Sequence, residues 1–343
     1  MFPVNKIIYF SPQPSPLISN EYISSFNDAL RKYFTIVNDG DRFRPAVIKE
    51  LFASFKVDYF ILNWPEDIVT KKGGIIQLWL CFLSVYFLKL TGGKLVWICH
   101  NKTPRGDRYK GVRLHALNWY VKHADLILTH AKEAVVHLRD MQHYKGELIY
   151  FPHPPYPGEI KGSGQTPDID SDILIWGNIH PYKGILEFIQ EYKKRNCTYT
   201  VYIIGKCNNL VYFQQLTDAA IGLPIRLQNI FPSDEQLKIC FEKTRMILLP
   251  YNEEKIYASG SLIHSLMSEK IIVGPETGNF KDLQELGICF TYSDYDDMFL
   301  LFDKYLKDCS LYKTTVSQVK KSICLYRQEY SWNRLAETIH AHL

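Results

Sequence analysis

The segment Trp176–Gly184 (WGNIHPYKG) carries the strongest pattern for chemistry in this sequence. An apolar run before it, Asp172–Trp176, predicts a strand, and the apolar spacing of Ile185–Lys194 predicts a helix after it. A strand, a glycine turn and the start of a helix bring main-chain N–H groups and a helix dipole to a point where phosphate can bind. Lys183 would add a positive charge there. The pattern favours a phosphate site, and its alternative is a plain strand-to-helix turn with a surface lysine.

A second group of polar residues follows the strand predicted at Lys94–Cys99. His100 and Asn101 would lie at the carboxyl end of this strand, the edge at which parallel α/β sheets bind ligands. The next loop is basic, and its Arg105 and Arg108 could bind the phosphate of an acceptor or an anionic membrane surface. An ordinary hydrogen-bonded histidine and a solvated basic loop are the alternatives.

Short apolar runs alternate with helix-like spacing along the whole chain. In the first half we expect strands at Lys6–Phe10, Phe34–Val37, Asp58–Asn63, Lys94–Cys99, Leu126–Thr129 and Glu147–Phe151, and helices at Asn20–Tyr33, Pro45–Phe55, Val112–His123 and Lys132–Met141. In the second half we expect strands at Asp172–Trp176, Thr198–Ile204, Ile225–Leu227, Met246–Pro250 and Ile271–Val273, and helices at Ile185–Lys194, Tyr212–Ile221, Asp234–Thr244, Ser261–Ser268, Met298–Lys307 and Leu311–Leu343.

This alternation predicts an α/β protein, because strands that alternate with helices form βαβ units and a parallel sheet. We expect two Rossmann-like, doubly wound parallel-sheet domains. The first covers residues 1–155, a Pro/Gly-rich linker covers 156–167, and the second covers 168–325. A C-terminal helix over 326–343 could pack back on the first domain.

Composition limits the class of protein. The sequence is 46% hydrophobic and 22% charged, which is ordinary for a soluble enzyme. Its eight cysteines include no C-x-x-C pair, so we expect reduced thiols in a cytoplasmic protein. No Cys/His cluster has zinc-ligand spacing, and the Asp-x-Asp spacings at Asp39 and Asp294 fit turns better than metal sites, so no metal is expected. The absence of GxxxxGK, GxGxxG and GxSxG motifs disfavours nucleotide hydrolases, typical dehydrogenases and α/β-hydrolases.

The distribution of charged and apolar residues indicates what kind of partner the first half of the chain binds. Residues 1–155 carry 20 Lys/Arg and 13 Asp/Glu, a net charge of +7, whereas residues 156–343 carry 20 and 23, a net charge of −3. The basic half suits an anionic partner, unless the difference is scatter. No nucleic-acid-binding module is recognisable, so nucleic acid is not expected. The apolar run Ile75–Leu90 is shorter than the ~20 residues that cross a bilayer, and predicts a buried helix or one whose edge touches a membrane surface.

The second half resembles the donor domain of GT-B glycosyltransferases, particularly the GT4-like group. Gly177, Lys183 and Gly184 match the G-R-x-x-x-x-K-G element that opens this domain, with Asn178 in place of the usual arginine. Later matches, in the same order, are Asn229–Leu237, Leu248–Tyr251, Ser259–Leu262, Glu269–Gly278 and Ser331-Trp332. The first half is similar in its expected architecture only.

The resemblance implies a nucleotide-sugar donor bound in a central cleft between the two domains. The donor-binding residues that it implies are Gly177, Asn178, Lys183, Asn229, Ile230, Ser259, Gly260, Ser261 and Leu262. Lys183 and the Ser259–Leu262 turn would hold the diphosphate, and Asn229 with Ile230 would meet the base. His100 would touch the donor sugar or the reacting centre, so that His100 and Lys183 are the implied catalytic residues. Asn101, Arg105 and Arg108 would lie on the acceptor side.

The sequence departs from this family at its glutamate pair. Many retaining members carry E-x7-E around the small-residue turn, but Ile256 and His264 stand at those two positions here. Glu253 and Glu254 lie upstream in a loop that could fold back. The stereochemical outcome, retention or inversion, therefore stays open.

Together these features predict a metal-independent glycosyltransferase with no cofactor besides its nucleotide-sugar substrate. It would act on a glycan or lipid-linked acceptor in surface polysaccharide or glycolipid synthesis, as a cytoplasmic protein that can be peripheral on the inner membrane surface. One alternative is a nucleotide-sugar 2-epimerase, against which the missing glutamates argue. The other is a non-catalytic sugar-nucleotide-binding subunit, which the departures at Asn178 and His264 would suit.

Overall fold

The computed structural model describes residues 6–13, 20–39, 51, 53–104, 108–157, 170–252 and 256–343 of the chain. The chain forms two compact units. Unit 1 comprises Met1–Tyr156, Lys255–Ala258 and Tyr330–Leu343, and unit 2 comprises Pro157–Glu254 and Ser259–Glu329. Each unit therefore draws on more than one stretch of the sequence.

Unit 1 is built on a parallel sheet of six strands in the order β2-β1-β3-β4-β5-β6. Its strands are β1 (Ile7–Ser11), β2 (Thr35–Ile36), β3 (Tyr59–Asn63), β4 (Lys94–Cys99), β5 (Leu126–Thr129) and β6 (Glu147–Tyr150). In β4, Trp97 and Cys99 enter one hydrophobic cluster, and Val96 and Ile98 enter another. This two-residue alternation shows that both faces of the sheet are covered.

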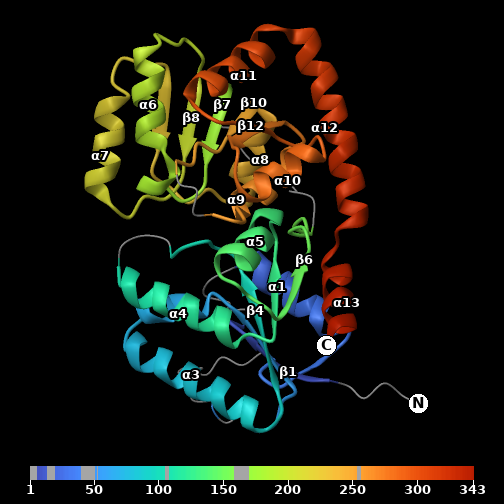
Figure 1. The fold of residues 1–343 in the computed structure, drawn as a ribbon. Helices are drawn as coiled ribbons and strands as arrows, with labels where there is room; N and C mark the ends of the chain where they lie inside the picture. The colour runs from blue at the N-terminus through green and yellow to red at the C-terminus, as the bar shows by residue number, and fades with distance from the viewer. Residues whose placement is uncertain are drawn as a thin grey trace. The chain divides into compact units, whose positions relative to one another are not determined.

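Two pairs of helices supply most of that cover (Figure 1). On one face lie α3 (Gly74–Leu90) and α4 (Lys110–His123), and on the other lie α1 (Glu21–Leu30) and α13 (Trp332–His342). Shorter elements are the 3₁₀-helix η1 (Pro65–Thr70), α5 (Lys132–Val136) and the π-helical turn η2 (His137–Met141). Ser331 caps the start of α13 by accepting a hydrogen bond from the Arg334 N–H. The Ser331-Trp332 pair, which resembles the late Ser-Trp of the GT4-like family, therefore begins this helix.

Unit 2 repeats this plan with the strand order β12-β11-β10-β7-β8-β9, again parallel throughout. The strands are β7 (Ser171–Trp176), β8 (Val201–Ile204), β9 (Ile225–Gln228), β10 (Thr244–Leu248), β11 (Ile271–Pro275) and β12 (Phe290–Tyr292). The helices are η3 (Pro181–Lys183), α6 (Ile185–Lys194), α7 (Leu210–Ala219), α8 (Asp234–Glu242), α9 (Gly260–Ser265), η4 (Leu266–Ser268), α10 (Gly278–Glu285), α11 (Tyr295–Lys307) and α12 (Cys309–Glu329).

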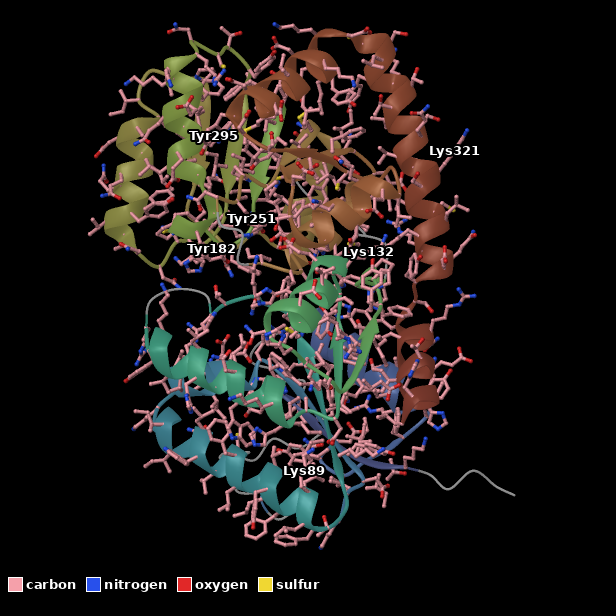
Figure 2. The ribbon with its side chains drawn as sticks, viewed as in Figure 1. Lys89, Lys132, Tyr182, Tyr251, Tyr295 and Lys321 are labelled. Atoms are coloured by element: carbon pink, nitrogen blue, oxygen red, sulfur yellow. The ribbon has the colours of Figure 1, made fainter. Side chains whose placement is uncertain are left out.

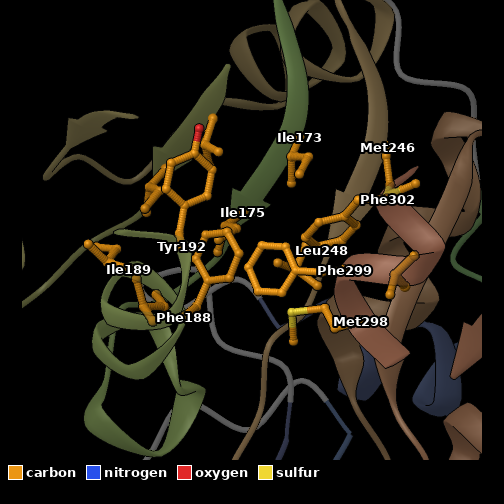
Figure 3. Close-up of a cluster of buried hydrophobic side chains, with 14 of the residues drawn as sticks. Ile173, Ile175, Phe188, Ile189, Tyr192, Met246, Leu248, Met298, Phe299 and Phe302 are labelled. Carbon is orange, nitrogen blue, oxygen red and sulfur yellow. The ribbon is translucent and has the colours of Figure 1, made fainter. Parts of the chain in front are cut away.

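One face of the unit 2 sheet is closed by α6, α7 and α11. Figure 3 shows the centre of this layer, where Phe188 of α6 meets Phe299 and Phe302 of α11 above the strands. The rings of Phe188 and Phe299 are parallel, with centroids 6.3 Å apart. This packing fixes α6, and with it the turn that carries Lys183, against the carboxyl ends of the strands.

The expected fold class is confirmed, since two Rossmann-like parallel-sheet units are present. The segment Leu311–Leu343 is helical as expected and consists of two helices, because Ser331 caps a new one. Several local predictions were wrong. The strand expected from Thr198 begins only at Val201, and the elements α10 and β12 were not anticipated. The helix expected at Pro45–Phe55 lies largely outside the described residues.

The apolar helix α3 is buried on one side only. Leu78, Val85 and Leu88 belong to the core, whereas Trp79 and Leu90 are 69% and 64% exposed. The expectation of a buried helix is therefore correct for half of its surface. Within the described residues, no helix is long and apolar enough to cross a membrane.

Candidate functional site

Lys183 lies at the edge of the unit 2 sheet where the strand order reverses. From β7 the chain adds β8 and β9 on one side, and then β10, β11 and β12 on the other. The loops after β7 and β10 therefore diverge at this topological switch point, where α/β sheets bind ligands beyond the carboxyl ends of their strands. Lys183 follows β7, and Tyr251 follows β10.

The Lys183 side chain is buried, with 6% of the residue exposed. Its Nζ donates to Tyr251 Oη at 2.5 Å and to Ser261 Oγ at 3.3 Å, and it lies 4.3 Å from the centre of the Tyr251 ring. Tyr182 packs beside Tyr251, with ring centroids 6.2 Å apart (Figure 2). In the part of the chain that the structure describes, no carboxylate pairs with Lys183. Among the described residues, the buried ammonium therefore meets hydroxyls and aromatic faces and no carboxylate.

Tyr251 links the lysine to the next loop. Its hydroxyl also lies 3.0 Å from Ser259 Oγ, which accepts a hydrogen bond from the Leu262 N–H and so caps α9. Burial alone would raise the pKa of Tyr251, but the Lys183 charge and the hydrogen bonds from Lys183, Ser259 and Ser261 outweigh it. The pKa of Tyr251 therefore lies below its ordinary value.

Two glycines allow the loops to approach so closely. A Cβ on Gly184 would lie 2.0 Å from the Pro250 carbonyl oxygen, and its φ of +67° is a left-handed conformation that side chains disfavour. A Cβ on Gly205 would lie 1.8 Å from the Gly177 carbonyl oxygen. Gly177 itself borders the site, because a Cβ there would meet Ser261 Oγ at 3.0 Å and Lys183 Nζ at 3.8 Å.

The other expected donor residues are distributed around this centre. Asn178 is exposed next to Gly177, and Gly260 is exposed at the start of α9, where Leu262 is buried. Asn229 lies after β9, and its side chain accepts from the Cys207 N–H at 2.8 Å and donates to the Cys207 carbonyl at 3.1 Å. Its side chain is therefore used to join two loops, while the neighbouring Ile230 is 37% exposed. The structure brings Gly177, Lys183, Ser259 and Ser261 together, and it joins Asn229 to the loop after β8 instead.

A polar pocket lies beside Tyr251. Its cavity volume is about 390 Å³, and residues at or just after the carboxyl ends of β10, β11 and β12 line it. They include Tyr292 and Tyr295 with the carboxylates of Glu276 and Asp294. Aromatic rings beside carboxylates offer stacking and hydrogen bonds to a hydroxyl-rich group.

In unit 1, His100 and Asn101 are both buried, with 5% and 4% exposed. His100 Nε2 lies 3.1 Å from Asn63 Oδ1, and its ring stacks on Trp64 with centroids 4.1 Å apart. Asn101 forms an isolated antiparallel bridge with Ile256, one of the two residues that replace the family's glutamates. The second, His264, lies on α9 with its ring 5.2 Å from that of Trp176. Burial lowers its pKa.

The remaining expected positions are less constrained. Arg108 is exposed, with its guanidinium 5.4 Å from the ring of Tyr109. Arg105, Glu253 and Glu254 lie outside the described residues. Among the described residues, no three His, Cys, Asp or Glu side chains gather as a metal site would require.

A group of buried rings around His100 was not anticipated. Tyr22 Oη lies 2.8 Å from His130 Nε2, and His130 Nδ1 lies 2.7 Å from the Phe151 carbonyl oxygen. Since a carbonyl only accepts, Nδ1 carries the proton and Nε2 accepts from Tyr22. Burial lowers the pKa of His130 to about 4, and burial with the nearby His130 lowers that of His153 to about 3. These imidazoles are therefore neutral at physiological pH.

The sequence matches no protein-family model and no curated protein. Its fold is nevertheless found in solved structures. HepE of Anabaena, solved with UDP-glucose, is 12% identical with a TM-score of 0.66, over 98% of this chain and 100% of that one. A sucrose-phosphate synthase from Thermosynechococcus elongatus is 10% identical with a TM-score of 0.67, over 98% and 97%. A glycosyltransferase from Rickettsia africae is 10% identical with a TM-score of 0.66, over 98% of each chain. The chain therefore has the GT-B fold.

Proposed function

We propose that this protein is a glycosyltransferase that moves a sugar from a nucleotide-sugar donor to a glycan or lipid-linked acceptor. The observation that carries the proposal is the buried ammonium of Lys183 at the switch point of unit 2, whose hydrogen-bond partners within the described residues are hydroxyls. A buried cation without a carboxylate is costly, and an anionic ligand at the site would compensate it. The similarity in fold to HepE, whose structure holds UDP-glucose, supports a nucleotide sugar as that ligand.

The proposed reaction breaks the bond between the anomeric carbon and the diphosphate oxygen, and that oxygen keeps the electron pair. The acceptor hydroxyl oxygen forms the new bond to the anomeric carbon and passes its proton to the departing diphosphate or to water. Negative charge grows on the diphosphate as the bond breaks. Lys183, with the Ser261 hydroxyl beside it, would stabilise this charge more in the transition state than in the bound donor, which accelerates the reaction.

Unit 1 would supply the acceptor side. We assign Asn101, Arg105 and Arg108 to it as residues that recognise a phosphorylated or lipid-linked acceptor. His100 would act at the reacting centre as a catalytic residue. The polar pocket beside Tyr251 would take a hydroxyl-rich part of the donor. In this proposal Lys183 supplies the positive charge at the diphosphate, and no metal or further cofactor is required. A role in surface polysaccharide or glycolipid synthesis, in the cytoplasm at the membrane surface, completes the proposal.

Donor binding is tested with a panel of nucleotides and nucleotide sugars, by their effect on Tm and by calorimetry. We expect one nucleotide sugar to stabilise the protein and Lys183→Ala to weaken its binding about 10- to 100-fold, as for loss of a charged hydrogen bond. Lys193→Ala, an exposed lysine on α6, is the matched control and should bind normally. The proposal fails if no member of the panel binds, or if both variants bind equally.

Transfer is tested separately by incubating the identified donor with lipid and glycan acceptor extracts. A glycosylated acceptor supports the proposal. An epimerised nucleotide sugar in the absence of acceptor would instead identify a 2-epimerase, and binding without any product would identify a non-catalytic subunit. His100→Gln should lower the rate of transfer more than it weakens donor binding, because the proposal places His100 at the reacting centre.

A further inference from the structure

Helix α3 has two apolar faces, which is unusual for a helix at the surface of a domain. Its inner face, with Leu78, Val85 and Leu88, completes the unit 1 core. Its outer face presents large apolar side chains to solvent, namely Ile76 (69% exposed), Trp79 (69%), Leu83 (40%), Tyr86 (58%) and Leu90 (64%). We call these five residues the α3 stripe.

The α3 stripe is continuous. Its members recur at spacings of three and four residues, so they lie one above another along the helix. Helix α3 has few polar residues, and each of them has a partner within the protein. Gln77 donates to the Lys72 carbonyl, Ser84 donates to the Leu80 carbonyl, and Lys89 pairs with Asp125. A helix that served only its own core would carry polar residues outward. The stripe therefore indicates an apolar partner outside the fold.

The surroundings of the α3 stripe are positively charged. Neither α3 nor its neighbour α4 contains an aspartate or a glutamate. The two helices touch through Phe82 and Trp119, whose ring centroids are 4.2 Å apart. Exposed lysines flank the stripe at both ends and on α4, namely Lys71, Lys72, Lys94, Lys110 and Lys122. None of these five lysines forms an ion pair with another described residue. An apolar stripe bordered by lysines is complementary to an anionic lipid surface.

A second copy of the chain fits this face less well. A symmetric dimer through the α3 stripe would place the same face of each copy against the other, and so would bring two sets of lysines together. An anionic bilayer instead satisfies both features, because acyl chains receive the apolar residues and headgroups receive the lysines. Trp79 and Tyr86 also belong to the residue types that favour the membrane interface.

We infer that unit 1 docks on an anionic lipid surface through the α3 stripe, with α3 parallel to the membrane plane. A helix of this length would insert its apolar face by about 5–10 Å without crossing the bilayer. Lysines on either side would hold it at the headgroups. The inference deepens the proposed function, since it names the surface that would bring the enzyme to a lipid-linked acceptor.

The test is co-flotation of the full chain with vesicles, in the absence of any donor. We expect binding to vesicles that contain phosphatidylglycerol, and at least about tenfold weaker binding to pure phosphatidylcholine, because several lysines contribute. Trp79→Gln/Leu83→Gln should weaken binding to the anionic vesicles by about tenfold or more, since two large apolar side chains lose their burial. Both positions are exposed, so the variant should keep its fold.

The matched control is Leu210→Gln/Val211→Gln on α7 of unit 2, where the residues are 72% and 71% exposed. It removes a similar exposed apolar area and should bind vesicles normally. Equal binding to both kinds of vesicle, or an equal loss in the two double variants, would overturn the inference. So would a dimer in sedimentation analysis that Trp79→Gln/Leu83→Gln dissolves while no vesicle binds. Donor affinity measured on the same samples shows whether the proposed function stands independently of this result.

Discussion

The two units place different polar groups at the same edge of the same kind of sheet. In unit 1, the residues beyond the strand ends include His100, His130 and His153, which pack with Tyr22 and are buried. In unit 2, the corresponding edge holds a lysine among hydroxyls. Burial makes two of the imidazoles neutral, so their polar atoms can be satisfied inside the fold. Lys183 instead donates to the hydroxyls of Tyr251 and Ser261.

This difference indicates that His130 stabilises the fold, and it supports the proposal that Lys183 binds a ligand. His130 donates to a main-chain carbonyl and accepts from a tyrosine, so its hydrogen-bonding capacity is used. Lys183 donates to the hydroxyls of Tyr251 and Ser261, and no carboxylate of the described residues pairs with it. We therefore expect changes at His130 to cost stability, and changes at Lys183 to cost function.

The largest expected effect is on turnover. Lys183→Ala should lower kcat by about 10²- to 10³-fold, as loss of one stabilising group for a developing anion does. The free energy of unfolding should stay the same or rise, because a buried charge is removed. Steady-state kinetics and chemical denaturation of the same preparation check both parts. A Lys183→Ala variant with normal kcat and lowered stability would contradict the functional role of Lys183 and indicate a structural role instead.

Replacing His130 should act mainly on stability. His130→Ala leaves a cavity and removes the acceptor of the Tyr22 hydroxyl, which together should cost about 2–4 kcal/mol of unfolding free energy. Tryptophan fluorescence is a suitable probe, because five of the six tryptophans belong to unit 1. His115→Ala, at an exposed position of α4, is the control and should change little. A stable His130→Ala protein would contradict the assigned role.

Acid should weaken unit 1 for the same reason. In the unfolded chain a histidine binds its proton near pH 6.5, whereas His130 and His153 in the fold do so only near pH 4 and pH 3. The unfolded state therefore binds more protons as the pH falls below 6.5, and stability is lost from there downward. Between pH 7 and pH 5 each ring should cost roughly 2 kcal/mol. Denaturation curves at the two pH values, with and without His130→Ala, measure this loss.

The smallest effect concerns Tyr251 and alkaline pH. Because the pKa of Tyr251 lies below its ordinary value of 10.0, the free protein loses this proton before pH 10. A negative donor beside Tyr251 would raise that pKa again, so donor affinity should fall as the pH rises through the free-state value, by up to about tenfold per pH unit. Tyr251→Phe should remove this dependence. Calorimetric titrations of the donor from pH 7 to pH 10 measure this for the wild-type protein and for Tyr251→Phe. A parallel loss of donor affinity in both proteins would contradict the prediction.

The sequence predicted more of the fold than of the site. Short continuous apolar runs such as Lys94–Cys99 are typical of strands buried on both faces, so they were located correctly. The helix α10 is short and mostly polar, and β12 has only three residues, and both were missed. Lys183 could be singled out because a local strand–turn–helix pattern surrounds it.

Tyr251 could not be found in the same way. It follows an apolar strand and has the pattern of a core residue, and it meets Lys183 only because β7 and β10 are neighbours in the sheet. His130 and His153 are lone histidines in the sequence, and tertiary packing alone joins them to Tyr22. Such residues could be found by listing the polar residue that follows each predicted strand, because the carboxyl ends of parallel strands lie at one edge of the sheet.

Helix α13 has a consequence for how the protein is made. It gives Trp332, Leu335 and Ile339 to the core of unit 1, and the Trp332 indole donates to the Pro155 carbonyl, 177 positions earlier in the chain. The ribosome therefore synthesises all of unit 2 before unit 1 can be completed. Unit 2 can therefore finish folding before unit 1. Until α13 is made, the face of unit 1 that α13 covers stays exposed to chaperones and to aggregation.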